Sequence, residues 1–500
     1  MIKIYVDWNV MSGMKNGYFP ELSKILEGSD KFLVVYSTSH IGDIFVSYSD
    51  SAEQQEVIRQ DLDYITSLTK NLCLANDSKM VNIHQYDPHE LLQDRVDEKH
   101  LFEDLSLDNL FKPVDGDDQL NAVINNLKQT IRNLPLDALF KDAFDHPETA
   151  EMLNKLFPGL KEEPTMEGFF KSFGRMYHNL NETEDYKHLR EMVQKVGVNS
   201  SHFSPDKNPF KQIEGVYEKS GVNPDQYVKK GDHAPEWFDE ITNEYLKLDL
   251  HGFKADKVKV TEKSKSTFRN TTEDASHSAF ASRCEIYITN DDRNYHKTLA
   301  VYDKLQIYTK VLKPQDFMDY YDSFLNVHGF DEHLQNLVST MKQQELFRTV
   351  VDEDGAYFGN IAYPNQYFFN FFNKITLPKS DDDASEMYFL ISKTPSANFY
   401  IITQDEIAGM VDIFVSRLGP DVDGKTKFDR SEMPDSEWEG RRWNMDFGEL
   451  RLRRLNGWFQ LYFYMAPLAD AAPPVADKQP TFFRRIFNFL KKRNKINTEK

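Results

Sequence analysis

Four aspartates stand where an α/β fold could bring their carboxylates together. Asp7 directly follows the apolar run IKIYV, and Asp291 follows the apolar start of IYITNDD. Asp43 and Asp274 are expected near the starts of two helices, in the segments SHIGDI and TTEDAS. Carboxylates in one place repel one another unless a cation neutralises them, and oxygen-rich clusters suit Mg²⁺ or Mn²⁺. The pattern predicts a catalytic metal site built from these acids, with Asp7, Asp274 and Asp291 holding the ions.

Each acid also has a simpler interpretation. Asp7 could cap a loop, and the pair Asp291 and Asp292 could form a turn. An acid in the first turn of a helix is favoured by the helix dipole by ~0.3–1 kcal/mol, with no function attached. Four acids at equivalent architectural places favour the site over four separate explanations.

Two histidines accompany the acids. His40 lies three residues before Asp43, and His277 lies three residues after Asp274, so each pair shares a helical face. Two histidines without nearby cysteines do not make a zinc site. We expect both to be structural partners of the acids rather than ligands.

The elements that must position these residues are buried strands and the helices that follow or precede them. Ligands of open α/β sheets bind at the carboxyl ends of apolar parallel strands. The helix of Asp274, expected to begin after a Thr272 cap, has small residues at one face: Ala275, Ser278, Ala279 and Ser282. We expect strands at 1–6, 31–36, 285–289 and 306–309, and helices at 21–27, 37–49, 54–71, 272–283, 294–302 and from 314.

The rest of the chain divides by composition. Residues 76–255 are polar and helical in pattern, and beyond 323 aromatic runs predict strands at 387–392, 398–402 and 458–464. The aromatic stretch 357–372 is expected in a core or interface rather than stacked on bases. The expected organisation is an α/β domain at 1–75 and 256–322, a helical insertion at 76–255, a C-terminal α+β domain at 323–468, a linker at 469–480 and a basic tail at 481–500.

The totals restrict the class of protein. The 500 residues carry 60 basic and 80 acidic side chains, a formal charge of −20, so the overall field does not steer the chain to nucleic acid. Cys73 and Cys284 alone give neither a disulfide framework nor a zinc set. No signal peptide is expected, and no window reaches ~18 uninterrupted apolar residues. We expect a cytoplasmic protein.

Two segments resemble PIN-domain nucleases. IYVDWNVMSG resembles the opening of that family, and DASHSAFASRCEIYITNDDRNY resembles its closing pattern of an acidic helix start, small residues, a strand and Thr-x-Asp. YSTSHIGDI resembles the second acidic position of some PIN-like proteins, and YTKVLKPQDF resembles the end of the domain. The resemblance covers about residues 1–71 and 256–321, and the long insertion departs from compact PIN domains.

The resemblance implies a three-layer α/β/α domain with a parallel sheet and a metal-dependent hydrolase of phosphodiester bonds, most often in RNA. By position it implies metal-binding acids at Asp7, Asp43, Asp274 and Asp291, support from Asn9 and Asn290, and a share of the metal for Asp292.

The sequence therefore favours a Mg²⁺- or Mn²⁺-dependent endoribonuclease, in which an activated water attacks phosphorus in line and leaves a 5′-phosphate and a 3′-hydroxyl. DNA stays open as a substrate, and a regulated toxin or defence effector is one setting. A haloacid-dehalogenase-like phosphatase is the second interpretation, although Asn9 replaces the second acid of its Asp-x-Asp motif. A catalytically degenerate scaffold that binds nucleic acid or protein is the third.

Other regions predict partners. The insertion is expected to be a lid or a protein-contact module, or a decorative addition, and the C-terminal domain could also contact a protein regulator. The tail sequence FFRRIFNFLKKRNK predicts a basic amphipathic helix for an anionic membrane, a nucleic acid or an acidic protein surface. The sequence leaves oligomerisation open.

Overall fold

The structure is a computed structural model of the chain. The residues that it describes are 1–77, 79–103, scattered positions within 150–194, 199–204, 207–220, 234–254, 260–261, 264–265, 268–351, 357–378, 387–393, 399–433, 437–445, 448–455 and 457–465. The expected linker and basic tail at 469–500 and much of the expected insertion lie outside these residues.

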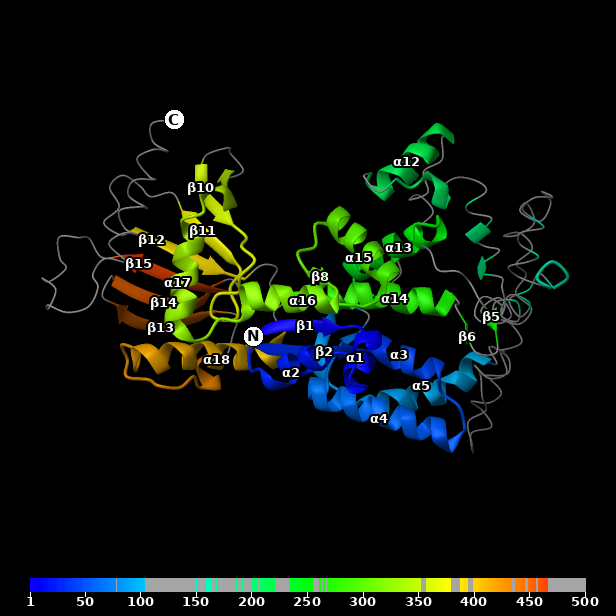
Figure 1. Ribbon diagram of the computed structural model, residues 1–500, viewed down its shortest axis with the longest axis horizontal. Helices are drawn as coiled ribbons and strands as arrows, with labels where there is room; N and C mark the ends of the chain where they lie inside the picture. The colour runs from blue at the N-terminus through cyan, green and yellow to red at the C-terminus, as the bar shows by residue number, and fades with distance from the viewer. Residues whose placement is uncertain are drawn as a thin grey trace, which may run out of the picture.

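A six-stranded, mostly parallel sheet forms the first unit (Figure 1). Five of its strands, β3, β2, β1, β7 and β8, form four parallel pairs. Only the edge pair of β3 and β4 is antiparallel. In spatial order the strands are β4 (Val81–Gln85), β3 (Leu72–Asn76), β2 (Phe32–Ser37), β1 (Ile2–Val6), β7 (Ile286–Ile288) and β8 (Lys310–Leu312).

Helices cover both faces of this sheet. Along β1, Ile4 and Val6 face one apolar cluster while Tyr5 faces another, because alternate residues of a strand point to opposite faces. Helices of the first cluster are α1 (Trp8–Lys15), α2 (Pro20–Gly28), α3 (Thr38–Val46), α4 (Ala52–Thr69), α5 (Pro88–Glu103) and α16 (Pro314–Tyr320). Helices of the second are α12 (Pro209–Ser220), α13 (Glu236–Leu250), α14 (Phe268–Ala281) and α15 (Asp292–Leu305). A short hairpin, β5 (Val260–Thr261) and β6 (Ser264–Lys265), precedes α14.

The strand order contains a reversal beside β1. The chain proceeds from β1 to β2 and β3 in one direction, and from β7 to β8 in the other. The helices that directly follow β1 and β7, namely α1 and α15, pack on opposite faces of the sheet. Such a reversal opens a crevice at the carboxyl ends of the two strands, which is where open α/β sheets bind ligands.

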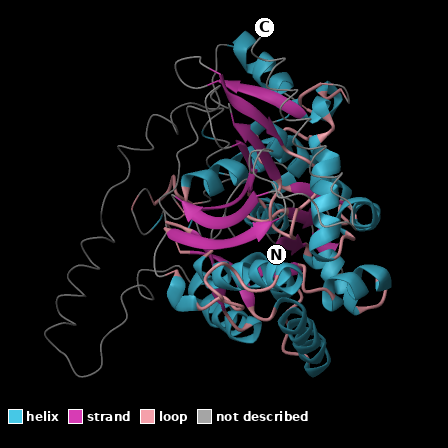
Figure 2. Ribbon diagram, turned by 90° about the vertical axis from the view of Figure 1, so that its left-hand side faces the viewer, coloured by secondary structure: helices cyan, strands magenta, loops and turns pink. Residues whose placement is uncertain are grey.

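A second unit holds a seven-stranded antiparallel sheet, which faces the viewer in Figure 2. Helices α17 (Gly329–Met341) and α18 (Tyr400–Leu418) pack on one face and share a single core with it. In spatial order the strands are β13 (Trp438–Met445), β14 (Gly448–Leu455), β15 (Trp458–Met465), β12 (Met387–Ser392), β11 (Lys374–Pro378), β10 (Tyr357–Ala362) and β9 (Phe347–Val351).

A buried ion cluster joins the two units. Lys3 of β1 and Glu285, just before β7, form an ion pair at 3.0 Å. From the second unit, Lys393 contacts Glu285 at 3.1 Å and Glu406 of α18 at 3.4 Å. All four side chains are at most 4% exposed, and we refer to them as the interface quartet. The quartet lies at the start of β1, at the end opposite to Asp7.

Most of the expected elements are present near their predicted places, and three expectations need correction, two in the first unit and one in the second. Helix α14 begins at Phe268, so Thr272 does not cap it and Asp274 is not in its first turn. The strand expected at 306–309 lies instead at 310–312, after Gln306 ends α15 in a left-handed conformation. The strand expected at 398–402 is the start of helix α18, because a short apolar run alone does not distinguish strand from helix.

Several features of the sequence keep their expected places. The small residues Ala275, Ser278, Ala279 and Ser282 of α14 are all buried. The aromatic stretch contributes Phe368, Phe369, Phe371 and Phe372 to the core of the second unit. The sheet of the first unit continues past residue 75, because β4 pairs with β3. Among the described residues, no helix is both long and apolar enough to cross a membrane.

Candidate metal centre

The register of the sheet places the ends of β1 and β7 side by side. Val6 lies opposite Ile288, and the backbone N–H of Asp7 donates to the carbonyl of Ile288 at 2.9 Å. Asp7 and Asp291 therefore follow the ends of two neighbouring strands at the reversal of strand order. The two apolar runs lie side by side, which is the arrangement that would bring these acids to one edge.

Asp7 is 4% exposed and is held by a ring of donors, all of which address its Oδ2 atom. The hydroxyl of Thr289 donates at 2.6 Å and the amide of Asn9 at 2.9 Å. Longer contacts come from the Tyr287 hydroxyl at 3.4 Å and the Asn294 amide at 3.5 Å. These bonds fix the orientation of the carboxylate and leave Oδ1 without a hydrogen bond from the described residues.

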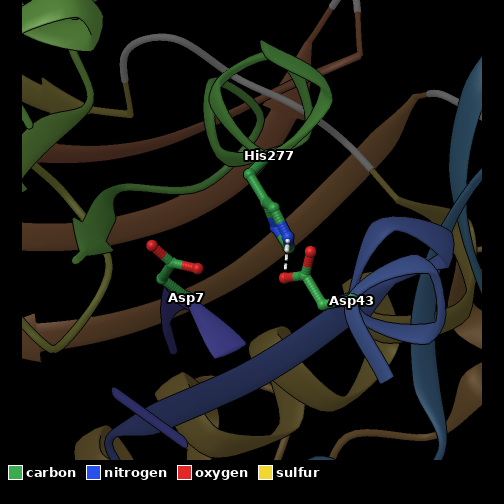
Figure 3. Close-up of side chains that lie close together, drawn as sticks. All are labelled: Asp7, Asp43 and His277. Carbon is green, nitrogen blue, oxygen red and sulfur yellow. Dashed lines mark hydrogen bonds and ion pairs between the residues drawn. The ribbon is translucent and has the colours of Figure 1, made fainter. Parts of the chain in front are cut away.

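Asp43, His277 and Asp7 approach one another from three elements: α3, α14 and the end of β1 (Figure 3). One ligand atom from each residue lies within 4.8 Å of the other two. The Nε2 atom of His277 is 2.9 Å from Oδ2 of Asp43. His277, which the sequence analysis pairs with Asp274, thus bonds to Asp43 across the gap between two helices.

The two histidines have different roles in the fold. Burial lowers the pKa of His277, but the adjacent Asp43 carboxylate outweighs burial and raises that pKa to about 9. The ring is then charged at neutral pH and offsets part of the acidic charge around it. His40 is buried and neutral: burial lowers its pKa, Nε2 donates to the Val6 carbonyl at 2.8 Å, and Nδ1 accepts from the Ser37 N–H at 3.0 Å. His40 therefore fastens the start of α3 to the end of β1.

Asp274 lies within electrostatic reach of the other acids. Burial raises its pKa most, followed by the charge of Asp7, while Lys297 lowers it and Asp43 and Asp291 raise it further. The other three predicted acids thus all act on the pKa of Asp274. The opposing charge, Lys297, is the amine of a fully buried side chain on α15.

Lys297 forms an ion pair with a residue outside 1–71 and 256–321, the two segments that carry the four acids. Its Nζ atom lies 2.5 Å from Oδ1 of Asp249, at the end of α13, and both side chains are fully buried. The Tyr186 hydroxyl donates to the other Asp249 oxygen at 2.6 Å. Helix α13, which the sequence analysis assigns to the insertion, is therefore part of the structure that balances the charge of the acids.

The last acidic pair divides between two roles. Asp291 caps α15, and its Oδ1 atom accepts from the N–H groups of Arg293 and Asn294, both at 2.7 Å. Asp292 is 87% exposed and pairs with Lys313 at 2.8 Å, which lowers its pKa. Asp292 is thus bound to a surface lysine, in contrast to the share of the metal expected for it.

Asn9 and Asn290 link the two strand ends. The amide of Asn9 donates to Asp7, and its oxygen accepts from the backbone N–H of Asn290 at 3.2 Å. The supporting position expected for Asn9 is present, whereas Asn290 takes part through its backbone.

The donor set fits a hard cation. Asp7, Asp43 and Asp291 each use one carboxylate oxygen for the fold, and their other oxygens accept no hydrogen bond from the described residues. Asp274 accepts none from them either, and the charges of Asp7, Asp43 and Asp291 raise its pKa. Carboxylates with unused oxygens suit Mg²⁺ and Mn²⁺. Among the described residues, the group with ligand atoms within 4.8 Å of one another is Asp7, Asp43 and His277, and it does not include Asp274 or Asp291.

Four residues of the site escape sequence reasoning: Tyr5, Thr289, Asn294 and Lys297. Tyr5 donates or accepts at 2.6 Å with both Ser37 and His277, so one buried hydroxyl connects three elements. Each of the four is a polar residue inside an otherwise apolar strand or buried helix face. A buried polar group requires a hydrogen-bond partner, and that requirement was the available signal.

Comparison with known proteins identifies no relative, since no protein-family model, no curated protein and no solved structure gives a significant match to the chain.

Proposed function

We propose that the chain is a Mg²⁺- or Mn²⁺-dependent endoribonuclease whose site is the acidic crevice at the ends of β1 and β7. One observation carries the proposal. Asp7, Asp43 and Asp291 are each held by one oxygen and present the other without a partner among the described residues, and ligand atoms of Asp7, Asp43 and His277 lie within 4.8 Å of one another. An acid that served only to cap a loop or a helix would not need to lie beside a second acid from another element.

The residues present supply what hydrolysis of a phosphodiester requires. When bound, Mg²⁺ or Mn²⁺ would supply a Lewis acid and an activated water. Asp7 and Asp43 would hold the ion, and the donors from Thr289 and Asn9 keep Asp7 in the orientation that this demands. Lys297 limits the repulsion among the acids, and the register of β1 and β7 keeps Asp291 next to Asp7.

The geometry of Asn9 disfavours the phosphatase alternative. A phosphoenzyme mechanism needs a general acid beside its aspartate nucleophile, and the amide of Asn9 cannot transfer a proton in that role. Asn9 instead donates to Asp7 and accepts from Asn290. The carboxylate that a nucleophile would use is therefore held by an orienting contact.

A cleavage assay tests the proposal. Wild-type protein and the Asp7→Asn and Asp291→Asn variants meet single-stranded RNA and DNA oligonucleotides labelled at the 5′ end, with Mn²⁺, Mg²⁺ or EDTA. The wild type should cut RNA internally only with metal and leave 5′-phosphate and 3′-hydroxyl ends. The variants should lose more than about 100-fold in rate, since partners of metal ligands alone are typically worth 10–100-fold.

Asp292→Asn is the matched control, because the residue adjoins Asp291 but is 87% exposed and paired with Lys313. It should cut as the wild type does. If the wild type cuts neither polymer, Mn²⁺ titration by calorimetry decides between the remaining possibilities. Binding that is lost in Asp7→Asn would preserve the metal site and reject the reaction, and absence of binding would leave the scaffold interpretation.

A further inference from the structure

The antiparallel sheet of the second unit has two unlike faces. Along β15, Phe459, Leu461 and Phe463 are buried under α17 and α18, while the alternate residues point to the other side. Among the described residues, no helix packs on that other side. Its centre carries tyrosines and arginines in place of the mixed small polar residues usual on a solvated sheet face.

Three tyrosines on this face lie side by side. Tyr462 and Tyr464 of β15 are stacked with centroids 5.7 Å apart, and Tyr388 of the neighbouring strand β12 lies 5.8 and 5.5 Å from them. Tyr388 is 37% exposed. Trp458, at the start of β15 on the same face, is 43% exposed. Tyr462 and Tyr464 are partly buried, so the most exposed aromatic rings of this face are those of Tyr388 and Trp458.

Arginines of the adjacent strands surround the rings. The guanidinium of Arg451 lies 5.0 Å from the Tyr464 centroid, and that of Arg453 lies 5.0 Å from the Tyr462 centroid. Arg442 of β13, opposite Arg451 in the register, is 46% exposed in its side chain. Glu449 pairs with Arg451 at 2.6 Å and with Arg442 at 3.9 Å, so these three arginines outnumber the one acid between them on a chain whose formal charge is −20.

We infer that this tyrosine–arginine face, consisting of Tyr388, Tyr462, Tyr464, Arg442, Arg451 and Arg453, binds single-stranded RNA. Open sheets recognise single strands by stacking unpaired bases on aromatic rings and guanidinium planes while cations contact the phosphates. Both groups are present here, with the arginines on β13 and β14 and the tyrosines on the next two strands, β15 and β12, and the charge is complementary. Gln460 lies on the same face, where its Oε1 atom accepts from the Tyr462 hydroxyl at 2.5 Å, and its amide can donate to the 2′-hydroxyls that distinguish RNA from DNA.

The choice of RNA rests on the proposed function, whereas the binding itself does not depend on catalysis. The acidic crevice lies at the far end of β1 from the second unit, because Lys3 at the start of β1 belongs to the interface quartet. The face would thus bind the polymer at a place separate from the acids on the same chain, which increases the polymer's local concentration at the acids. The residues of the two sites do not overlap, so each can be removed alone.

The test measures binding to the full chain in EDTA. The probe is a 12-nucleotide oligo-uridine labelled with fluorescein, followed by fluorescence anisotropy, with the DNA equivalent and an RNA duplex in parallel. The wild type should bind the single-stranded RNA most tightly. The logarithm of its affinity should fall with the logarithm of salt concentration with a slope of about −2, as three arginines predict for a single strand.

Substitutions separate stacking and charge from folding. Tyr462→Thr and Tyr464→Thr keep a β-branched residue in the strand and should each weaken binding roughly tenfold, whereas Tyr462→Phe should bind as the wild type does. Arg453→Glu should weaken binding and flatten the salt dependence. Tyr18→Ala and Arg430→Ala remove the same residue types at exposed positions elsewhere, 76% exposed for Tyr18 and 74% for the Arg430 side chain, and should have no effect.

Several outcomes would overturn the inference. One is the absence of saturable binding, and another is tighter binding of DNA or of the duplex. A third is binding as tight as that of the wild type by threonine variants that retain the wild-type circular dichroism and melting temperature. A fourth is a change of oligomeric state in a threonine variant, which would assign the face to a second copy of the chain. If the wild type cleaves RNA but the variants of this face bind RNA as tightly as the wild type, only this inference is rejected. If the wild type binds RNA through this face but does not cleave it, only the proposed nuclease is rejected.

Discussion

Thr289 connects two acids of the candidate metal centre through one hydroxyl. Its Oγ1 atom donates to Oδ2 of Asp7 at 2.6 Å and accepts from the backbone N–H of Asp291 at 3.3 Å. The side chain is fully buried at the end of β7. A hydroxyl can serve both neighbours because it is a donor and an acceptor at once, and this gives a physical reason for Thr two residues before the acid.

Replacing Thr289 by Val should weaken the site more than the fold. Val keeps the shape, so the lost hydrogen bond to a charged group should lower the free energy of unfolding by about 1.5–3 kcal/mol. Mn²⁺ affinity and cleavage should fall about 10–100-fold, because Asp7 loses its shortest orienting contact. Thr289→Ser keeps the hydroxyl and should stay close to the wild type in both calorimetry and cleavage.

Thr309→Val is the matched control for this prediction. The Thr309 hydroxyl is also buried but donates to the carbonyls of Ser282 and Cys284, away from the acids. It should lower stability without changing Mn²⁺ affinity. Equal losses of affinity in the two variants would mean that general destabilisation, and not the orientation of Asp7, governs the site.

The close contact of α3 and α14 sets the distance between Asp43 and His277. Gly42 lies where a Cβ atom would be 2.2 Å from Oε1 of Glu273, so the absence of a side chain lets the two helices approach. The Glu273 carboxylate is held there by Arg95 of α5 at 3.1 Å. Glycine is therefore required at position 42, next to Asp43, for close packing of the two helices and not for an unusual backbone conformation.

Gly42→Ala should force Glu273 out of its ion pair with Arg95. We expect a loss of roughly 1–3 kcal/mol in stability from overpacking, and weaker Mn²⁺ binding as Asp43 moves from His277. Adding Glu273→Ala should restore most of both losses, because the obstructing carboxylate is gone. Gly409→Ala is the control in helix α18, where a Cβ meets nothing within 4 Å, and should stabilise by about 0.5–1 kcal/mol. Failure of the double variant to recover would contradict the steric explanation.

The sequence predicts which acids follow the ends of strands better than it predicts which residues bond to those acids or balance their charge. The ends of β1 and β7 can be predicted from continuous apolar runs, which are typical of buried parallel strands. The partner of Lys297 does not follow, because Asp249 belongs to a helix whose polar sequence reads as an insertion. The start of α14 cannot be predicted from the sequence either, because Thr272 has the residue type of a helix cap although its hydroxyl donates to the carbonyl of Arg269, one turn earlier. Sequence patterns within a short segment mislead where contacts with distant residues decide between two local structures.

At the scale of the whole molecule, the interface quartet makes stability depend on acid pH. Burial alone would raise the pKa of Glu285, but Lys3 and Lys393 outweigh it and lower that pKa from 4.5 to about 2. The same lysines lower the pKa of Glu406 against its burial. A carboxylate whose pKa is lowered by folding contributes stability above its unfolded pKa and loses it as pH falls through the folded value.

The free energy of unfolding should therefore fall between about pH 4.5 and pH 2, with Glu285 alone accounting for roughly 3 kcal/mol. Urea unfolding at a series of pH values measures this loss. Asp331→Asn is the control, because the Asp331–Arg417 pair is a surface contact with both side chains more than half exposed, and should leave the acid profile unchanged. An acid profile that stays flat down to pH 2 would exclude a linkage through the quartet.

A double-mutant cycle tests whether the quartet acts as one charge-balanced unit. Lys393→Met leaves two buried carboxylates with Lys3 as their lysine partner, and Glu406→Met removes a carboxylate that faces both lysines and, at 3.8 Å, the Met1 amine, so each should cost about 3–5 kcal/mol. The double variant leaves Lys3 and Glu285 as a balanced pair and should cost far less than the sum of the two, as measured by urea unfolding. Additive losses would mean that the four residues act separately.

Lys3 and Asp7 stand four residues apart on one strand, about 13 Å at the usual rise, so Mn²⁺ affinity should be unchanged in any variant that remains folded. A fall in affinity in the double variant would instead show that the second unit communicates with the acids along β1.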